Sequence, residues 1–197
     1  ARLLGCLALA AALAALVLAP AAGAATKTYL ALGDSLAFGY QQATFNAGLP
    51  NPSPASFKHG YVDDFYLALR LTGKANKLVN DGCPGETTIS FINGPCGYQA
   101  IGFGLHHPYS GGPFSSQRSD ALNYIATHPG EVRTITLDIG ANDALGVING
   151  VCNRDPVCIA NQAPALFSSI AGNLGSILAQ LRGAAPSARL VVLGLYN

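Results

Sequence analysis

Three short stretches of the sequence place a hydroxyl, a glycine and an amide directly after apolar segments. Ser35 lies in "YLALGDSLAFGY", Gly85 in "VNDGCPGETT" and Asn142 in "LDIGANDAL". A serine hydroxyl can attack a carbonyl carbon, and a glycine N–H or an asparagine amide can hydrogen-bond the oxygen that becomes negative. The residue types therefore indicate nucleophilic acyl chemistry. The alternative is that Ser35 and Asn142 only cap the helices that follow them.

The segments that must position these residues alternate between two hydrophobic patterns. Short β-like apolar runs occupy 29–32, 77–79, 134–139 and 190–195. Apolar residues recur at helical spacing in 61–71, 115–128 and 163–183. This alternation predicts an α/β fold with a central parallel sheet, helices on both of its faces and right-handed crossovers. Ligands bind at the carboxyl ends of the strands in such sheets, which is where the three stretches fall.

Two long inserts interrupt the alternation. Residues 41–60 and 93–114 are rich in Gly, Pro, Asn and Ser, which is typical of surface loops. Long loops within one domain often carry function, so we expect these inserts to lie around a binding cleft. We find no internal repeat, no linker and no second domain, and we expect one domain over 26–197.

The stretches "LALGDSLAFG", "NDGCPGETT" and "LDIGAND" follow one another at roughly fifty-residue intervals. In this order they resemble the first, second and third sequence blocks of the GDSL (SGNH) hydrolases, a family of lipases and esterases. The residues of these motifs are close to those of secreted bacterial members, and the resemblance covers most of the chain from Thr28 onward. It implies a three-layer α/β/α sandwich of the flavodoxin-like, SGNH hydrolase type.

The resemblance also implies a role for each of the three residues. Ser35 corresponds to the family's serine nucleophile, Gly85 to the glycine of the second block and Asn142 to the asparagine of the third. Carboxylic esters would be hydrolysed through an acyl-enzyme on Ser35. The oxyanion hole would consist of the backbone N–H groups of Ser35 and Gly85 and the side-chain amide of Asn142. The resemblance implies no metal and no cofactor.

The general base that such a serine needs is not found in the sequence. The family takes it from an Asp-x-x-His pair close to the C-terminus, and none of the four histidines has an aspartate three residues before it: His59, His106, His107 and His128. We therefore expect the chain to be incomplete at its C-terminus, and the absence of an initial Met suggests the same at its N-terminus. We expect His106 and His107 to line or cover the cleft rather than to take part in catalysis.

Three aspartates near the candidate residues could be considered as triad acids. Asp34 precedes the proposed nucleophile directly, so its side chain should point elsewhere and make a structural hydrogen bond in the turn. We expect the same of Asp138 and Asp143.

The N-terminal segment 1–25 has the features of a secretory signal peptide. No charged residue occurs between Leu3 and Ala25, Arg2 precedes the run, and "APAAGAAT" supplies the small residues of a cleavage site near Ala24 or Ala25. We expect a secreted protein with no stable membrane span after cleavage. An uncleaved membrane anchor and lipidation at Cys6 are the alternatives.

Four cysteines remain once the leader is removed, and in an exported chain they predict two disulfides. Proximity in the sequence favours Cys83 with Cys96 and Cys152 with Cys158. The alternative, a metal site formed with His106 and His107, would lack any short C-x-x-C pair.

The composition limits the partners. Half of the residues are hydrophobic and 11% are charged, which is enough apolar material for one substantial core. The formal charge of +1 gives no reason to expect nucleic acid as a partner. Our first hypothesis is a secreted serine esterase or lipase acting on small-molecule or lipid esters. The alternatives are a non-catalytic exported binding module and a carbohydrate or peptidoglycan O-deacetylase of the same fold.

Overall fold

The computed structural model describes residues 25–194, so the predicted signal peptide, apart from Ala25, lies outside the described residues. Four strands form one parallel sheet in the order β2-β1-β3-β4. They are β1 (Thr28–Gly33), β2 (Lys77–Asn80), β3 (Val132–Asp138) and β4 (Arg189–Leu193). Each coincides with one of the four predicted apolar runs. The predicted α/β fold with a central parallel sheet is confirmed.

Three longer helices connect the strands, namely α4 (Tyr61–Leu71), α7 (Gln117–Thr127) and α9 (Pro156–Ala184). The first two match the predicted segments closely. α9 begins seven residues before the predicted start at Ala163, because Asp155 caps it by accepting a hydrogen bond from the Val157 N–H and Pro156 occupies its first turn. The helix also accommodates Pro164, which is exposed to solvent.

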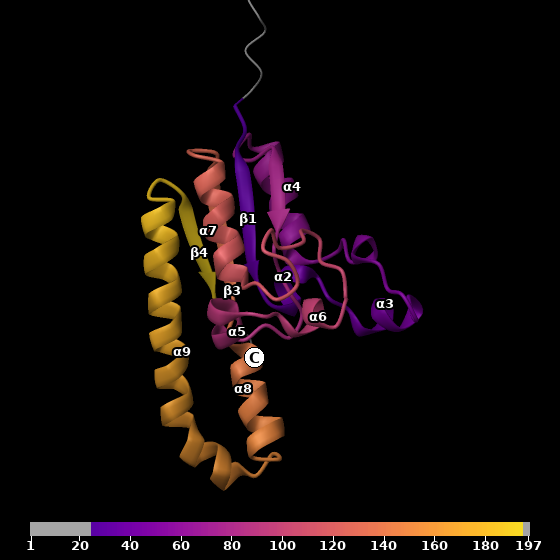
Figure 1. Ribbon diagram of the computed structural model, residues 1–197, viewed down its shortest axis with the longest axis vertical. Helices are drawn as coiled ribbons and strands as arrows, with labels where there is room; N and C mark the ends of the chain where they lie inside the picture. Colours follow the sequence, from indigo (N-terminus) through magenta and orange to yellow (C-terminus); the bar gives the residue numbers. More distant parts are fainter. Residues whose placement is uncertain (1–24, 195–197) are drawn as a thin grey trace, which may run out of the picture.

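Shorter helical segments lie at the strand ends and in the inserts. α2 (Ser35–Phe38), α5 (Thr88–Asn93) and α8 (Ala141–Leu145) follow β1, β2 and β3, respectively. The inserts contain α3 (Gln42–Ala47), the 3-10 turn η1 (Pro54–Ser56) and α6 (Gly97–Ala100), and a π-helical segment η2 (Gly146–Val151) continues α8. Figure 1 shows α9 on one side of the molecule and the inserts with α3 and α6 projecting on the other.

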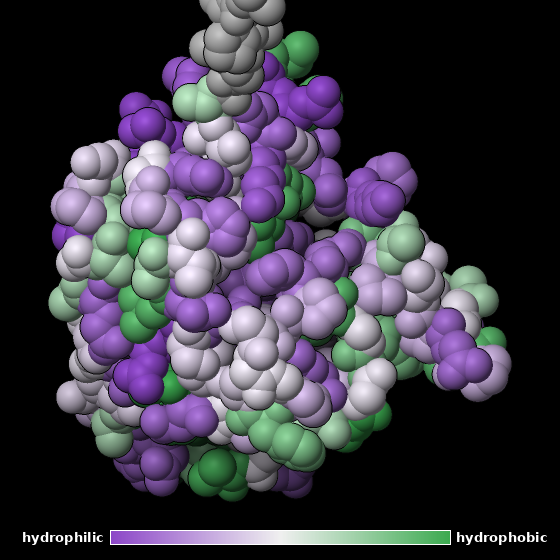
Figure 2. Space-filling view, turned by 45° about the horizontal axis from the view of Figure 1, so that its top comes forward, coloured by the Kyte–Doolittle hydropathy of each residue, from purple (hydrophilic) through white to green (hydrophobic). Residues whose placement is uncertain are grey.

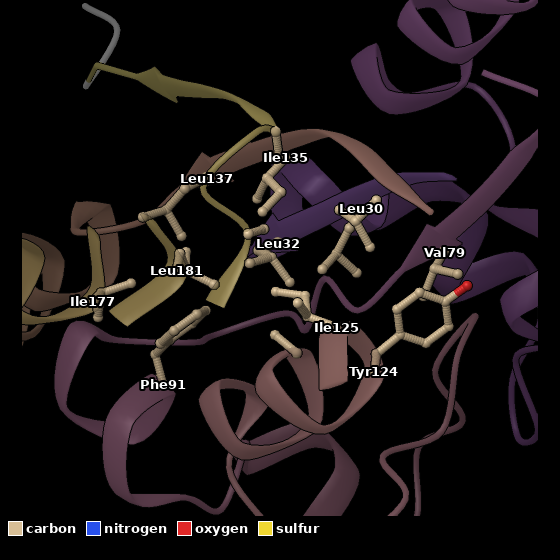
Figure 3. Packing of buried hydrophobic residues seen from close by; sticks show 14 of the residues in the cluster. Leu30, Leu32, Val79, Phe91, Tyr124, Ile125, Ile135, Leu137, Ile177 and Leu181 are labelled. Atoms are coloured by element: carbon tan, nitrogen blue, oxygen red, sulfur yellow. The ribbon is translucent and has the colours of Figure 1, made fainter. Parts of the chain in front are cut away.

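The sheet is covered on both faces, which gives three layers. Along β1, Leu30 and Leu32 face one side, where they pack in one cluster with side chains of α5, α7 and α9 (Figure 3). Tyr29 and Ala31 face the other side and pack against α4 and α2. The alternation follows from the two-residue period of a strand, and burying both faces explains why β1 is apolar throughout. The predicted α/β/α layering is confirmed.

Two disulfides are present, Cys83–Cys96 and Cys152–Cys158, in the pairing that sequence proximity favoured. The first fastens the second insert to the loop after β2, and the second joins the end of η2 to α9. Because these sulfurs are bonded to one another, they are not available as thiolate ligands to a metal. Within 25–194, none of the helices combines the length and the apolar character that crossing a bilayer requires.

Candidate active site

The carboxyl ends of β1, β2 and β3 meet at one edge of the sheet, and the structure brings Ser35, Gly85 and Asn142 to this edge. Figure 1 shows the short helices α2, α5 and α8 gathered there. The Asn142 side chain makes the connection: its Nδ2 donates to the backbone oxygen of Glu86 at 2.9 Å and to Asp34 Oδ2 at 3.3 Å. Asn142 therefore bridges the residue after Gly85 and the residue before Ser35.

A tight turn places Ser35 at the start of α2. Gly33 has a φ of +138°, and a Cβ at this position would lie 2.1 Å from the backbone oxygen of Asp138, so only glycine fits. The Asp34 N–H donates to the same Asp138 oxygen at 3.0 Å. Asp34 Oδ1 accepts from the Leu36 N–H at 3.0 Å, which caps the helix. Asp34 therefore makes the structural hydrogen bond in the turn that the sequence led us to expect.

The donors at this edge are not all equally available. Within the described part of the chain, the backbone N–H groups of Ser35 and Gly85 have no hydrogen-bond acceptor, and the Ser35 hydroxyl makes no hydrogen bond. Gly85 adopts a left-handed conformation with φ of +79°. In contrast, both hydrogens of the Asn142 amide are engaged, one of them in the longer 3.3 Å bond to Asp34. Two free backbone donors and one exchangeable side-chain donor therefore lie at the sheet edge that carries Ser35, although neither Gly85 nor Asn142 lines the cleft at Ser35.

Two further aspartates at this edge differ in their surroundings. Asp143 accepts hydrogen bonds from the Thr88 N–H at 2.8 Å and from Thr88 Oγ1 at 2.6 Å, so it ties α8 to α5. Asn173 of α9 donates to the same threonine hydroxyl at 2.9 Å. Asp138 is buried and its Oδ2 has no partner within 25–194, so the structural hydrogen bond expected of this side chain is not found there. Burial raises the pKa of its carboxyl to about 7. Burial also raises the pKa of Asp34.

A buried glutamine below the edge joins the serine turn to the Gly85 loop. Gln117, at the start of α7, is fully buried. Its Oε1 accepts from the Gly33 N–H at 2.6 Å, and its Nε2 lies within hydrogen-bond distance of the Gly33 oxygen, Glu86 Oε2 and the Tyr109 hydroxyl at 2.9, 3.2 and 3.0 Å. The sequence pattern does not indicate this residue, because a glutamine in the first turn of an amphipathic helix has the pattern of a surface position.

Glu86, which follows Gly85, is also fully buried. Besides Gln117, its carboxylate accepts a hydrogen bond from the Ser90 hydroxyl. Burial outweighs these hydrogen bonds and raises the pKa of Glu86 to about 7. A buried ionisable group therefore lies directly behind the loop that carries the Gly85 donor.

A cleft of about 380 Å³ opens at Ser35 and is lined mainly by apolar side chains. His59 is exposed and lines this cleft, together with Tyr40, Tyr61 and Leu193. It is the only one of the four histidines, all of which lie in the described range, to do so.

The other three histidines have their ring contacts elsewhere. His106 Nε2 lies 3.0 Å from the Phe38 oxygen, and the two rings pack with centroids 4.5 Å apart. His107 contacts two aspartates, and His128 stacks on Tyr124. Neither histidine of the second insert lines the cleft at Ser35, so the expectation that they would line or cover the cleft is not met there.

A second cleft, of about 340 Å³, lies between the two inserts. It is lined largely by apolar and aromatic residues, among them Phe45, Leu49, Tyr98, Ile101 and Phe103. Figure 2 shows hydrophobic residues on the surface of the projecting insert region. The Tyr98 ring connects the clefts, because it lies 6.0 Å from the Tyr40 ring at the serine cleft. Among the described residues it is also the only group that a Cβ on Gly85 would contact, at 3.7 Å.

Comparison with known proteins gives a limited likeness. No family model matches the chain, and no curated protein matches it. Among solved structures, the chain is similar to the crystal structure of AlinE4, described as an SGNH-hydrolase family esterase, with 18% identity, a TM-score of 0.33, and coverage of 84% of this chain and 75% of that chain. Two mutants of the same esterase match with 18% and 17% identity and the same TM-score. Likeness at this level assigns neither a family nor an activity.

Proposed function

We propose that the protein is a secreted serine esterase or lipase that hydrolyses carboxylic esters through an acyl-enzyme on Ser35. The proposal rests on one observation. Within 25–194, the Ser35 hydroxyl makes no hydrogen bond, and the backbone N–H groups of Ser35 and Gly85 at the same sheet edge have no acceptor. Ser35 is the first residue of α2, where N–H groups have no partner within the helix, and Gly85 is exposed in its turn, so both donors are open to an incoming oxygen.

The chemistry follows from these positions. Ser35 Oγ attacks the ester carbonyl carbon while a general base takes its proton, and the carbonyl oxygen becomes negative between the two backbone N–H groups. Asn142 contributes a third donor by exchanging its 3.3 Å bond to Asp34 for the oxyanion. Collapse of the intermediate expels the alcohol, which receives the proton from the base. Water activated by the same base then attacks the acyl-enzyme, releases the carboxylic acid and regenerates Ser35.

The resemblance to GDSL hydrolases assigns the base to the histidine of an Asp-x-x-His block, which residues 1–197 do not contain. Among the described residues, His59 is the histidine that lines the serine cleft. The absence of any hydrogen bond to the Ser35 hydroxyl within 25–194 favours one second candidate, a binding module that retains the cleft without turnover. A complete gene product that binds esters but hydrolyses none of them would support this alternative.

The experiment that tests the proposal uses the complete gene product and a short p-nitrophenyl ester. We expect hydrolysis that Ser35→Ala abolishes and that Asn142→Ala lowers by about a hundredfold in kcat. Ser187→Ala, which removes an exposed serine far along the chain, serves as the matched control and should retain parental activity. Normal hydrolysis by Ser35→Ala would remove the basis of the proposal.

The aromatic cleft between the inserts suggests where the acyl chain is bound. An acyl group on Ser35 that passes Gly85 meets the Tyr98 ring and then the apolar walls of that cleft. Burying several methylene groups there would favour medium-length chains over acetate by about 0.8 kcal/mol per group. We expect Tyr98→Ala to lower kcat/KM for an octanoyl ester by about tenfold with little effect on acetate, and a parental preference for acetylated sugars would instead support the O-deacetylase alternative.

The N-terminal leader and the disulfides support the secreted location. Residues 1–25 match a signal peptide, and the two disulfides fit a protein that matures in an oxidising compartment. N-terminal sequencing of the protein recovered from the culture medium of its host tests this, with cleavage expected near Ala24 or Ala25. An intact leader on cell-associated protein would contradict it.

A further inference from the structure

A second cluster of chemically active side chains lies away from the serine cleft. Asp81 directly follows β2, His107 lies in the second insert, and Asp120 is in the first turn of α7. His107 Nδ1 is 2.7 Å from Asp81 Oδ1 and 3.3 Å from Asp120 Oδ2. One ligand atom from each of the three residues lies within 4.8 Å of the others. None of the three lines the cleft at Ser35.

The two carboxylates in this cluster are buried and incompletely paired. Asp81 is 0% exposed and Asp120 is 2% exposed. Within 25–194, Asp81 Oδ2 and Asp120 Oδ2 are buried atoms that accept no hydrogen bond. His107 has a single hydrogen on Nδ1, which its short contact commits to Asp81, and no lysine or arginine of the described range pairs with either aspartate. Buried charge without full pairing is costly, and in the described range these two carboxylates share His107 as their only positively charged partner.

Charge counting favours a divalent ion over a proton. A protonated imidazole with two carboxylates leaves a net charge of −1 in a buried place. A divalent cation bound to the neutral imidazole and the same carboxylates leaves no net charge and uses the bare oxygens. In such a site the ligand nitrogen and oxygen lie about 3.3 Å apart, so a small outward movement of His107, which an insert carries, makes room for the ion.

The surroundings have other features of a metal site. The backbone N–H of Ser110 donates to Asp120 Oδ1 at 2.5 Å, which orients that carboxylate from behind. The Tyr109 hydroxyl donates to the backbone oxygen of Asp81 at 2.9 Å. His107 is partly exposed and lines a cleft of about 220 Å³, through which an ion can enter and water can complete the coordination.

We propose that Asp81, His107 and Asp120 form a binding site for a divalent transition-metal ion of the zinc class. One imidazole nitrogen and two carboxylate oxygens are ligands that Zn²⁺ accepts, with water in the remaining position. The ion fastens the second insert to the end of β2 and to α7, three elements that Cys83–Cys96 joins only in part. The site is structural and does not depend on the proposed ester hydrolysis, although it departs from the expectation that the protein holds no metal.

The test measures Zn²⁺ itself on the complete gene product, kept under non-reducing conditions. Chelator-treated protein is titrated with ZnCl₂ by calorimetry, and its metal content after dialysis is measured by mass spectrometry. We expect one equivalent of Zn²⁺ and a rise in melting temperature on binding. Asp120→Asn and His107→Gln should each lower the affinity by at least about tenfold and abolish the rise in melting temperature.

His128→Gln, which alters a histidine stacked on Tyr124 outside the cluster, serves as the control and should bind like the parent. Bound Co²⁺ gives a second readout, since its visible absorption bands should be lost in His107→Gln. Asp81→Asn should lower the affinity in the same way, and if it fails to fold, Asp120→Asn and His107→Gln still decide the question. Absence of Zn²⁺ binding by the parent, or binding that both variants leave unchanged, would overturn the proposal and identify the cluster as a protonated histidine between two aspartates.

Discussion

Replacing Glu86 by glutamine should change how the stability of the protein depends on pH. Burial raises the pKa of Glu86 from its ordinary value of 4.5 to about 7, so the folded protein holds this proton more tightly than the unfolded chain does. The resulting stabilisation is fully present below about pH 4.5 and is lost as the pH rises through about 7. The difference between the two pKa values corresponds to roughly 3 kcal/mol.

Glu86→Gln keeps the shape of the side chain and removes its charge. The new amide oxygen can accept from Gln117 Nε2 and the amide nitrogen can donate to the Ser90 hydroxyl, so the buried network retains its partners. At pH 8 the variant should therefore be more stable than the parent by up to roughly 3 kcal/mol, whereas near pH 5 the two should differ little.

The measurement is urea unfolding of both proteins, followed by circular dichroism, at several pH values between 5 and 8. The quantity compared is the difference in free energy of unfolding between variant and parent at each pH. Glu131→Gln, which changes the other glutamate of the chain in the turn before β3, controls for the loss of a negative charge elsewhere. A difference that stays constant with pH, or a parent that is more stable at pH 8, would refute the reasoning.

Three further predictions follow from the same contacts. Gly33→Ala should destabilise the protein by about 3 kcal/mol or more, because its Cβ would lie 2.1 Å from the Asp138 oxygen, whereas Gly73→Ala, at a positive φ with open space, should cost only about 1 kcal/mol; denaturant unfolding distinguishes them. Gln117→Leu leaves the Gly33 turn and Glu86 without their shared partner, so it should lower the free energy of unfolding by roughly 3 kcal/mol and should change kcat more than KM. If Gln117→Glu loses kcat only in proportion to its loss of folded protein, Gln117 has no positioning role. His59→Gln should retain ester hydrolysis if the base comes from an Asp-x-x-His block, and a loss of kcat of about a hundredfold or more would identify His59 as the base.

The sequence alone was sufficient for the order of strands and helices along the chain, because the apolar periods of 2 and 3.6 residues are local properties. It also located Ser35, Gly85 and Asn142 at one sheet edge, since parallel strands have their carboxyl ends on the same side. Both disulfides could be paired because their partners are close in the chain, 13 and 6 residues apart. The prediction started α9 at Ala163, whereas the helix begins at Pro156 after the capping residue Asp155.

Only the tertiary structure decided which polar groups are buried and which donors are free. Glutamine and glutamate usually lie on the surface. Gln117 and Glu86 are buried here because the first turn of α7 packs against Gly33, which is 84 residues away in the chain. The engagement of the Asn142 amide by Asp34 likewise depends on a contact across 108 residues. The burial and pairing of a polar side chain are set by neighbours that are distant in the sequence, whereas the local pattern fixes only the secondary structure on which that side chain is carried.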